Sequence, residues 1–318
     1  MLKLLIVKTS SLGDVIHNLP VLADVRAHFS DAQIDWVVEE SFADIPRLHP
    51  HVNQVLTVAF RRWRKRLFCA NTWAEINQFK KIIKQNQYDV VIDTQGLLKS
   101  ALITHYAQGI KHGYDKHSIR EPLASRFYDV KHAISYQQHA VTRNRTLVAQ
   151  SLDYALPASA PDYGITASKC ELSIPNNFIV ALHGTSRDSK LWPVQHWVEL
   201  GLALSEQGLS LALPWASDAE QARAQTIHQY VANSIILPKL NIHKLAGVIA
   251  QAQAAIGVDT GLSHLAAALN IPTIAIYTDT NPALTGVMAG AQAKAINLGC
   301  ISQTPSVDVV LQALKQTQ

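Results

Sequence analysis

Short apolar runs alternate with amphipathic stretches along the first half of the chain. The apolar runs that we interpret as strands lie at residues 4–8, 34–40, 55–60 and 88–96. Between them, residues 14–28 and 72–86 have the spacing of apolar positions that is typical of helices. Strands that alternate with helices of this length predict a parallel β-sheet with helices on both faces.

Residues 152–178 interrupt this pattern with prolines and a glycine, and we place a linker near residues 155–172. The alternation then resumes, with strands at 178–184, 209–215, 254–259 and 273–277 and helices at 196–208, 218–232, 243–253, 261–269 and 307–316. Two such series predict an α/β protein with two Rossmann-like domains, residues 1–160 and 172–318. Open α/β sheets bind ligands outside the carboxyl ends of their strands, so we expect the site in a cleft between the two domains.

Composition narrows the class of protein. Of the 318 residues, 48% are hydrophobic and 16% are charged, which is typical of a globular protein and not of a disordered one. No apolar run has the roughly 18–20 residues that a membrane-spanning helix needs. The N-terminal MLKLLIVK is too short for a signal peptide and is interpreted as the first strand. The three cysteines are far apart, which disfavours disulfides and a zinc site and predicts a cytoplasmic location.

The first candidate site is the turn after the strand at 4–8, with the sequence KTSSLGDVIH from Lys8 to His17. Backbone N–H groups and the helix macrodipole point outward at such a strand–turn–helix junction. The turn is neither a Walker loop nor a complete dinucleotide fingerprint, because it has one glycine and no Gly-Lys-Ser/Thr. Asp14 is either the N-cap of the next helix or a carboxylate in the cleft that accepts a proton from a hydroxyl.

A second candidate is HGTSRDSK at residues 183–190, directly after a strand. Thr185 and Ser186 supply hydroxyl donors and Lys190 supplies a positive charge. These groups suit a departing diphosphate, on which negative charge accumulates. The alternative is an ordinary polar loop that happens to contain a lysine.

The third candidate, VDTGLSH at residues 258–264, is the most specific of these signals. Gly261 allows close approach of a ligand to the backbone, and the N–H groups of the following helix form an anion site. The alternative makes Asp259 and Thr260 helix caps and His264 a surface residue. HExxH, paired-cysteine and Asp-x-Asp motifs are absent from the sequence, so we expect the phosphates to be neutralised by protein donors and not by a metal ion.

The segment FRRWRKRLF at residues 60–68 concentrates positive charge. If it is helical, Phe60, Trp63 and Leu67 form one apolar stripe flanked by cations, which suits an anionic membrane surface. A modest basic excess in residues 1–165, with 20 Lys and Arg against 15 Asp and Glu, agrees with an anionic partner for this half. Nucleic acid is disfavoured because the chain lacks base-reading modules, and a solvated basic helix is the remaining alternative. Asp93, at the end of another strand, is either a loop cap or a carboxylate that supports the site.

These motifs resemble glycosyltransferase family 9, which contains the bacterial lipopolysaccharide heptosyltransferases. The stretches that carry the likeness are VKTSSLGDVIH, DWVVEE, RRWRK, IDTQGLLKS, KHG, REPLAS, QQHAV, RDSKLWP, LPW and VDTGLSHL, and they extend over essentially the whole chain. The resemblance implies a GT-B fold and inverting transfer of heptose from ADP-L-glycero-β-D-manno-heptose, without a metal or cofactor. It implies that the acceptor is the Kdo of Kdo₂-lipid A, at the cytoplasmic face of the inner membrane. It leaves open whether the last helix packs back on the N-terminal domain.

The resemblance also implies roles for individual residues. Asp14 matches the catalytic base and Lys190 the cation on the donor phosphates. The positions that match contacts to the diphosphate are Thr185, Ser186, Thr260, Gly261 and His264. Asp259 matches a contact to the heptose hydroxyls, and Glu220 a contact to the ribose. The positions that match the anionic acceptor site are Arg61, Arg62, Arg64, Lys99, Arg120, His139 and Arg143.

Two departures from the family pattern affect the donor side. Ser186 replaces a threonine, which preserves the hydroxyl, and the turn after Tyr277 reads Thr-Asp-Thr-Asn-Pro. The sequence is also compatible with three other functions. They are transfer from another nucleotide sugar, a dinucleotide-dependent sugar-nucleotide enzyme, and a sugar-binding protein without catalysis.

Overall fold

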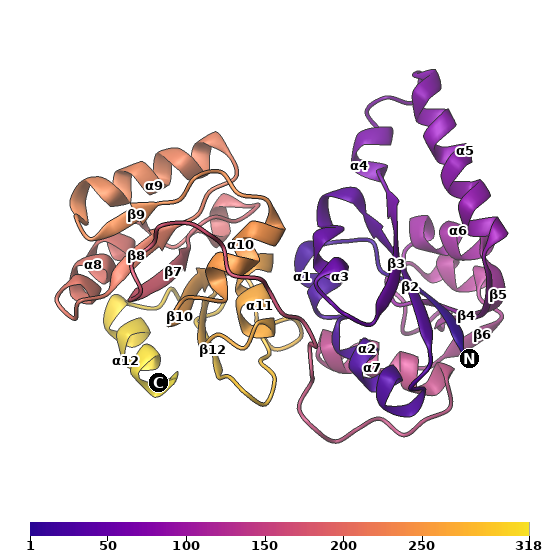
Figure 1. Cartoon of the computed structure of the whole chain (residues 1–318). Helices are drawn as coiled ribbons and strands as arrows, with labels where there is room; N and C mark the ends of the chain where they lie inside the picture. The colour runs from indigo at the N-terminus through magenta and orange to yellow at the C-terminus, as the bar shows by residue number, and fades with distance from the viewer. Residues whose placement is uncertain (318) are drawn as a thin grey trace. The chain divides into compact units, whose positions relative to one another are not determined.

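A computed structural model describes residues 1–317, which form two compact units. Unit 1 is Met1–Gly164 and unit 2 begins at Ile165. Each unit consists of a six-stranded, fully parallel sheet with helices packed on it (Figure 1). Residues 152–177, which contain the linker expected from the sequence, have neither helix nor strand. The predicted α/β fold class is therefore confirmed.

The sheet of unit 1 has the strand order β3-β2-β1-β4-β5-β6. Its strands are β1 (Lys3–Val7), β2 (Gln33–Glu39), β3 (Val52–Val58), β4 (Gln87–Asp93), β5 (Gln108–Tyr114) and β6 (Val130–His132). Its helices are α1 (Leu12–Ile16), α2 (Pro20–His28), α3 (Asp44–Arg47), α4 (Phe60–Trp63), α5 (Ala70–Gln85), α6 (Leu98–Tyr106) and α7 (Ala140–Ser151), with short 3₁₀ turns η1 (Glu40–Phe42) and η2 (Pro122–Phe127). Because β1 lies in the centre, its residues Leu4–Val7 are fully buried, which explains why this strand is apolar without alternation.

Unit 2 repeats the architecture with the order β12-β11-β10-β7-β8-β9. Its strands are β7 (Phe178–Leu182), β8 (Ser210–Leu213), β9 (Ser234–Ile236), β10 (Ala254–Val258), β11 (Thr273–Ile276) and β12 (Ala295–Leu298). Its helices are α8 (Val194–Ser205), α9 (Asp218–Tyr230), α10 (Ile242–Ile249), α11 (Gly261–Ala268) and α12 (Val307–Thr317), with a 3₁₀ turn η3 (Asp188–Lys190). Sheet order places β7 and β10 side by side, so the loops after these two strands emerge at the same edge.

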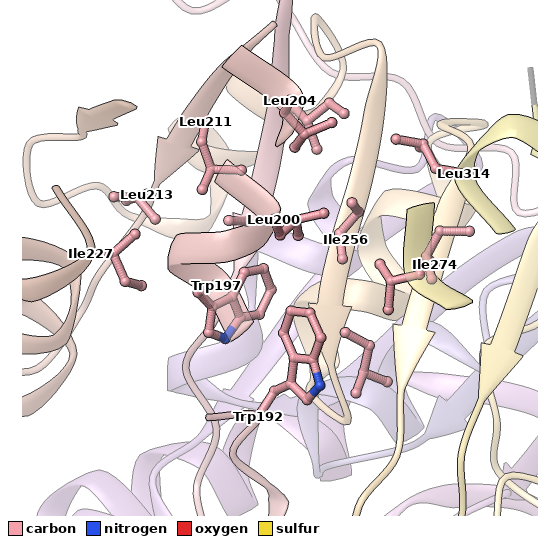
Figure 2. Close-up of a cluster of buried hydrophobic side chains, with 14 of the residues drawn as sticks. Trp192, Trp197, Leu200, Leu204, Leu211, Leu213, Ile227, Ile256, Ile274 and Leu314 are labelled. Carbon is pink, nitrogen blue, oxygen red and sulfur yellow. The ribbon is translucent and has the colours of Figure 1, made fainter. Parts of the chain in front are cut away.

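The core of unit 2 lies between its sheet and the helices α8, α9 and α12 (Figure 2). Trp192 and Trp197 are fully buried there, with their rings in an edge-to-face arrangement at a centroid distance of 5.1 Å. The indole N–H of Trp192 donates to the carbonyl of Pro305 at 2.9 Å. Leu314 of α12 belongs to this core, so the last helix packs on the sheet of unit 2. Trp192 thereby anchors the segment that follows η3.

The structure corrects several elements that the sequence pattern predicted. The helix expected at 14–28 is two helices, α1 and α2, since Pro20 begins the second one. Strands β5, β6 and β12 and helices α6 and α7 were not predicted from the pattern. The segment at residues 60–68 is helical only over Phe60–Trp63, so it does not form the apolar stripe that a longer helix would have. No helix among residues 1–317 is long and apolar enough to cross a membrane.

Candidate active site

In unit 1, Asp14 lies in the first turn of α1, directly after the loop that follows β1. Its Oδ2 accepts hydrogen bonds from the backbone N–H of Ser11 at 2.7 Å and from the Ser11 hydroxyl at 2.9 Å. Ser11 is the N-cap of α1, so the interpretation of Asp14 as the N-cap is wrong. Asp14 is half-buried, and the Ser11 bonds engage only one of its two carboxylate oxygens.

Two lysines contact the loops around Asp14. Lys8 is buried, and its ammonium donates to the carbonyl of Thr94 at 2.8 Å. Burial lowers the pKa of Lys8, while the nearby Asp14 carboxylate acts in the opposite direction. Lys99, at the start of α6, donates to the Ser10 hydroxyl at 2.9 Å, and burial lowers its pKa also. Both cations therefore lie near the candidate base. Lys8 was not predicted to have a role, because a lysine at a strand end carries no signal of its burial.

Helix α7 brings two further candidates to this region. His139 caps the helix by accepting from the N–H of Val141, and its ring is 5.5 Å from that of His17, at the end of α1. The guanidinium of Arg143 lies 4.2 Å from the ring centroid of Tyr136, a cation–π arrangement. Its Nε is buried and has no hydrogen-bond partner within the described part of the chain. Arg143 also contributes electrostatically at Lys8, so α7 and the Asp14 turn belong to one cluster.

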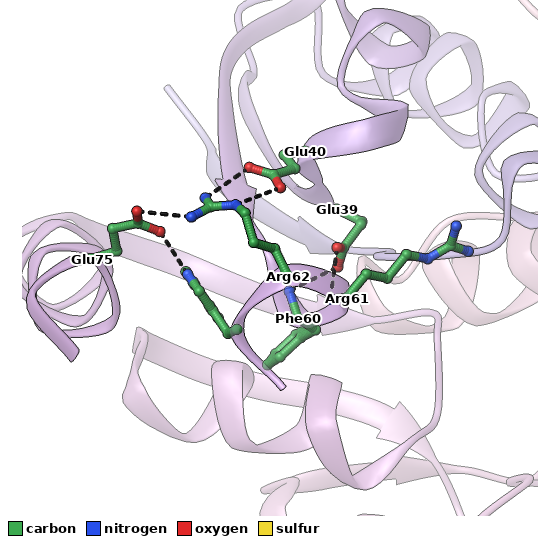
Figure 3. A network of polar contacts seen from close by, with 7 residues as sticks. Glu39, Glu40, Phe60, Arg61, Arg62 and Glu75 are labelled. Atoms are coloured by element: carbon green, nitrogen blue, oxygen red, sulfur yellow. Dashed lines mark hydrogen bonds and ion pairs between the residues drawn. The ribbon is translucent and has the colours of Figure 1, made fainter. Parts of the chain in front are cut away.

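The other basic candidates of unit 1 differ in whether their side chains already form ion pairs within the protein. Arg62 donates to both carboxylate oxygens of Glu40 at 3.0 Å and to Glu75 at 2.9 Å (Figure 3). The carboxylate of Glu39 accepts from the backbone N–H groups of Phe60 and Arg61 and so caps α4. In Figure 3 the Arg61 side chain extends away from this network, and its guanidinium lies 4.7 Å from the ring centroid of Phe42. Arg64 and Arg120 are exposed.

The segment after α4, residues 64–68, is attached at its base through Arg62 and Trp63 and is exposed at its tip, Leu67 and Phe68. Trp63 is buried and donates from its indole to Glu75 at 2.7 Å. The Arg62 hydrogen bond is the largest influence that lowers the pKa of the Glu75 carboxyl. By contrast, Leu67 is 50% exposed and Phe68 is fully exposed. A cavity of about 340 Å³ adjoins the base of this segment, and its lining includes Glu39, Glu40, Arg61, Arg62, Lys65 and Arg66.

In unit 2, the loop after β7 is hydrogen-bonded to Asp259, which directly follows β10. Its carboxylate accepts from the Lys190 ammonium at 2.5 Å and from the Thr280 hydroxyl at 2.6 Å. Its backbone carbonyl accepts from the Thr185 hydroxyl at 2.9 Å. The Lys190 and Asp259 side chains are only 13% and 16% exposed, so their charges are poorly screened by water. Thr280, which belongs to the turn that departs from the family pattern, was not predicted.

Helix α11 begins at Gly261, immediately after Asp259 and its N-cap Thr260. Neither residue satisfies the helix N-terminus with its side chain, because Thr260 makes no capping bond and the Asp259 carboxylate is turned to Lys190. Thr260 therefore holds the N-cap position without a side-chain capping bond, and the interpretation of Asp259 as a cap is wrong. His264 is buried at 7% exposure, so it is not the surface residue of the alternative interpretation. Backbone N–H groups at a helix N-terminus favour an anion, and this N-terminus directly follows Asp259, which binds Lys190.

Glu220, in the first turn of α9, lies against Gly184 in the loop after β7. Its Oε2 accepts from the backbone N–H groups of Ala216 and Ser217 at 2.7 and 3.0 Å and completes the capping box of α9. A Cβ at Gly184 would lie 2.5 Å from Glu220 Oε1, so a larger residue there would displace the Glu220 side chain. Ser186, two residues further on, is exposed. The structure thus brings Glu220 together with the loop that carries Thr185.

The turn after β11 is hydrogen-bonded to η3. The Ser189 hydroxyl donates to Asp279 at 2.6 Å, and the Thr278 hydroxyl donates to the Ser189 carbonyl at 2.8 Å. This turn therefore orients the segment that ends in Lys190. No group of three or more His, Cys, Asp or Glu side chains suited to holding a metal ion exists among the residues that the structure describes.

Comparison with known proteins identifies the family. The model of glycosyltransferase family 9 (heptosyltransferase) matches residues 76–313. The chain belongs to this family. Lipopolysaccharide heptosyltransferase 1 of Pseudomonas aeruginosa is 47% identical over 293 residues, covering 92% of this chain and 82% of the relative. The Salmonella typhimurium protein of the same name is 47% identical over 288 residues, covering 90% of this chain and 91% of the relative.

Solved structures of the family match both the fold and the length of the chain. The E. coli heptosyltransferase WaaC with ADP has a TM-score of 0.91 and 42% identity, with 99% of each chain covered. The same enzyme with ADP-2-deoxy-2-fluoro heptose has a TM-score of 0.88 and 41% identity, also over 99% of each chain. The two-sheet architecture is therefore that of the family 9 GT-B enzymes.

Proposed function

We propose that this family 9 glycosyltransferase moves L-glycero-D-manno-heptose from ADP-heptose to Kdo of Kdo₂-lipid A, in synthesis of the lipopolysaccharide inner core. The observation that carries the proposal is the polar centre of unit 2, where Lys190, Asp259 and Thr185 meet at the N-terminus of α11. A cation and the N–H groups of a helix N-terminus suit a diphosphate, and a carboxylate suits sugar hydroxyls. Relatives at 47% identity are named lipopolysaccharide heptosyltransferase 1.

Unit 2 is the proposed donor domain. Lys190 contacts the diphosphate of ADP-heptose, together with the hydroxyls of Thr185 and Ser186. Thr260, the first turn of α11 and His264 complete the set of donors. As the bond to the anomeric carbon breaks, negative charge grows on the departing ADP, and each such donor is worth about 2.7–4 kcal/mol in the transition state. Protein groups thereby supply the neutralisation that a metal ion provides in other enzymes.

Asp259 and Glu220 are proposed to recognise the rest of the donor. The Asp259 carboxylate accepts from sugar hydroxyls, and Glu220 Oε1, which no backbone N–H of the capping box occupies, accepts from the ribose. Both carboxylates are oriented by hydrogen bonds from neighbouring residues, so little side-chain entropy is lost when the donor binds.

Unit 1 is the proposed acceptor domain. Asp14 removes the proton from a Kdo hydroxyl, and the resulting nucleophile attacks the anomeric carbon of the heptose from the face opposite to ADP. A single displacement of this kind inverts the anomeric configuration, because no sugar–enzyme intermediate forms. Lys99, His139 and Arg143 lie around the Asp14 turn and suit the carboxylate of Kdo, and Arg61, Arg64 and Arg120 supply further cations for the lipid phosphates.

Arg62 is the exception among the acceptor candidates. Its guanidinium is already bound by two carboxylates, so we assign it the structural task of holding the base of the segment after α4. The cations around it, Arg64, Lys65 and Arg66, are exposed beside Leu67 and Phe68. This tip combines apolar side chains with positive charge and is the proposed contact with the anionic cytoplasmic face of the inner membrane.

The decisive experiment is turnover with purified components. We expect release of ADP from ADP-heptose only when a Kdo-bearing lipid is present, and a heptosylated lipid of matching mass. Transfer from UDP- or GDP-sugars but not from ADP-heptose would support the alternative of another nucleotide-sugar transferase. Bound NAD in the purified protein would instead support a dinucleotide-dependent enzyme.

A further inference from the structure

Two loops at the carboxyl edge of the unit 1 sheet meet beside Asp14. One loop follows β1 and the other follows its neighbour β4. Gln95, in the second loop, accepts with its side-chain oxygen from the backbone N–H groups of Thr9 and Ser10, both at 2.9 Å. Only the oxygen of an amide group can accept from two N–H donors, so these bonds fix the orientation of the Gln95 amide.

Gln95 is itself held by a buried carboxylate. Asp93 Oδ1 accepts from the backbone N–H groups of Gln95 and Gly96 at 2.8 and 3.1 Å, and its Oδ2 accepts from the Tyr128 hydroxyl at 2.7 Å. Asp93 is fully buried, and burial raises the pKa of its carboxyl. The loop-cap interpretation of Asp93 is therefore confirmed, and the loop that it caps is the one that carries Gln95.

The segment that Gln95 holds continues directly into the candidate base. Ser10 is bonded to Gln95, and the next residue, Ser11, donates its N–H and its hydroxyl to Asp14 Oδ2. A shift of the Ser10 backbone therefore moves both donors that orient the Asp14 carboxylate. Lys99 contacts the same segment only through the Ser10 hydroxyl, and so it does not replace the two backbone bonds.

We propose that Gln95 is a positioning residue that holds the loop of Thr9–Ser11 and thereby aims the Asp14 carboxylate at the acceptor hydroxyl. This inference rests on the proposed function of Asp14 as the base. General-base catalysis requires a heavy-atom distance of about 2.6–3.2 Å, and a misplacement of about 1 Å costs about 100-fold in rate. Gln95 acts on the rate through Asp14 without touching the donor nucleotide.

The test compares Gln95→Met with Gln95→Glu. Methionine has a similar shape but removes the acceptor, whereas glutamate keeps an oxygen that both N–H groups can reach. We expect Gln95→Met to lower kcat about 10- to 100-fold with little change in the KM for either substrate. Gln95→Glu should recover kcat to within a few-fold of the wild type. Gln87→Met, at the exposed opposite end of β4, is the matched control and should behave as the wild type.

Three results would overturn the inference. They are wild-type kcat in Gln95→Met, an equal loss in Gln95→Glu, and a loss confined to KM. Thermal unfolding midpoints are measured for all variants, and Gln95→Glu decides the question if the methionine variant is unstable. An inactive wild-type protein would count against the proposed function itself, whereas an active wild type with an equally active Gln95→Met would count against the positioning role alone.

Discussion

The ion pair between Lys190 and Asp259 predicts opposite changes in ADP affinity when one or the other partner is replaced. The ammonium is already shared with a carboxylate at 2.5 Å, so a donor diphosphate has to compete with Asp259 for it. Replacement of Lys190 by Met removes the attraction to the diphosphate and also leaves the Asp259 carboxylate without its cation. Replacement of Asp259 by Asn keeps the ammonium and removes its competitor.

The size of the expected change in ADP affinity follows from the burial of the Lys190–Asp259 pair. At an effective dielectric constant of 20, two unit charges 4 Å apart interact with about 4 kcal/mol. Part of this energy is offset by water and by the remaining donors of the site. We therefore expect Lys190→Met to weaken ADP binding at least about 100-fold, or about 2.7 kcal/mol, and Asp259→Asn to strengthen it about tenfold.

The assay is titration calorimetry of ADP with the two single variants and the double variant. The double variant should bind ADP more tightly than Lys190→Met, because it lacks the repulsive carboxylate. Lys315→Met, on the exposed side of α12, controls for the loss of one positive charge from unit 2. Unchanged ADP affinity in Lys190→Met would refute the assignment of the diphosphate to this cation. Weaker binding in Asp259→Asn would refute the competition.

Four other perturbations test the base, a buried histidine, the exposed tip and the role of metal ions. Asp14→Asn should lower kcat by about 10²- to 10⁴-fold without changing ADP affinity in calorimetry, and a wild-type rate would remove Asp14 from the mechanism. Burial lowers the pKa of His183 to about 4 from 6.5, so its contribution to stability is complete above pH 6.5 and is lost as the pH falls toward 4. At pH 5 the loss is about 2 kcal/mol, so chemical denaturation of His183→Leu should depend less on pH than that of the wild type or of the exposed-site control His228→Leu. Phe68→Ser should reduce co-sedimentation with anionic vesicles, while the matched exposed aromatic change Tyr230→Ser should not, and equal binding by both would exclude the tip as the membrane contact. Turnover should persist in EDTA, and a requirement for Mg²⁺ would contradict neutralisation of the diphosphate by protein donors.

The fold and the two motifs that meet in unit 2 were predictable because their signals are local. Continuous apolar runs such as Leu4–Val7 follow from burial on both faces of a parallel sheet, and the sequence shows them directly. Lys190 and Asp259 each lie in a contiguous motif directly after a strand, and the neighbouring positions of β7 and β10 bring these motifs together. The short strands β6 and β12 were not predicted, because three or four residues carry too little pattern.

The segment after α4 shows what the pattern could not reveal. Its cations looked alike in sequence, but Arg62 is paired with Glu40 and Glu75, which lie 22 and 13 residues away. Trp63 would lie on the apolar stripe of a helix at residues 60–68, but it is buried in the core of unit 1, where Glu75 accepts its indole N–H. Tertiary partners at this separation override a helical pattern of only nine residues.

The candidate base illustrates the same limit in the catalytic machinery. Asp14 is identifiable from its own turn, yet the group that holds this turn, Gln95, is 85 residues from Ser10 along the chain. It is brought there because β1 and β4 are neighbours in the sheet, and this neighbour relation depends on the whole topology of unit 1. A residue that acts through a backbone has no chemical signature of its own in the sequence. Its importance is therefore measurable only as a rate that falls when the acceptor oxygen is removed and returns when that oxygen is restored.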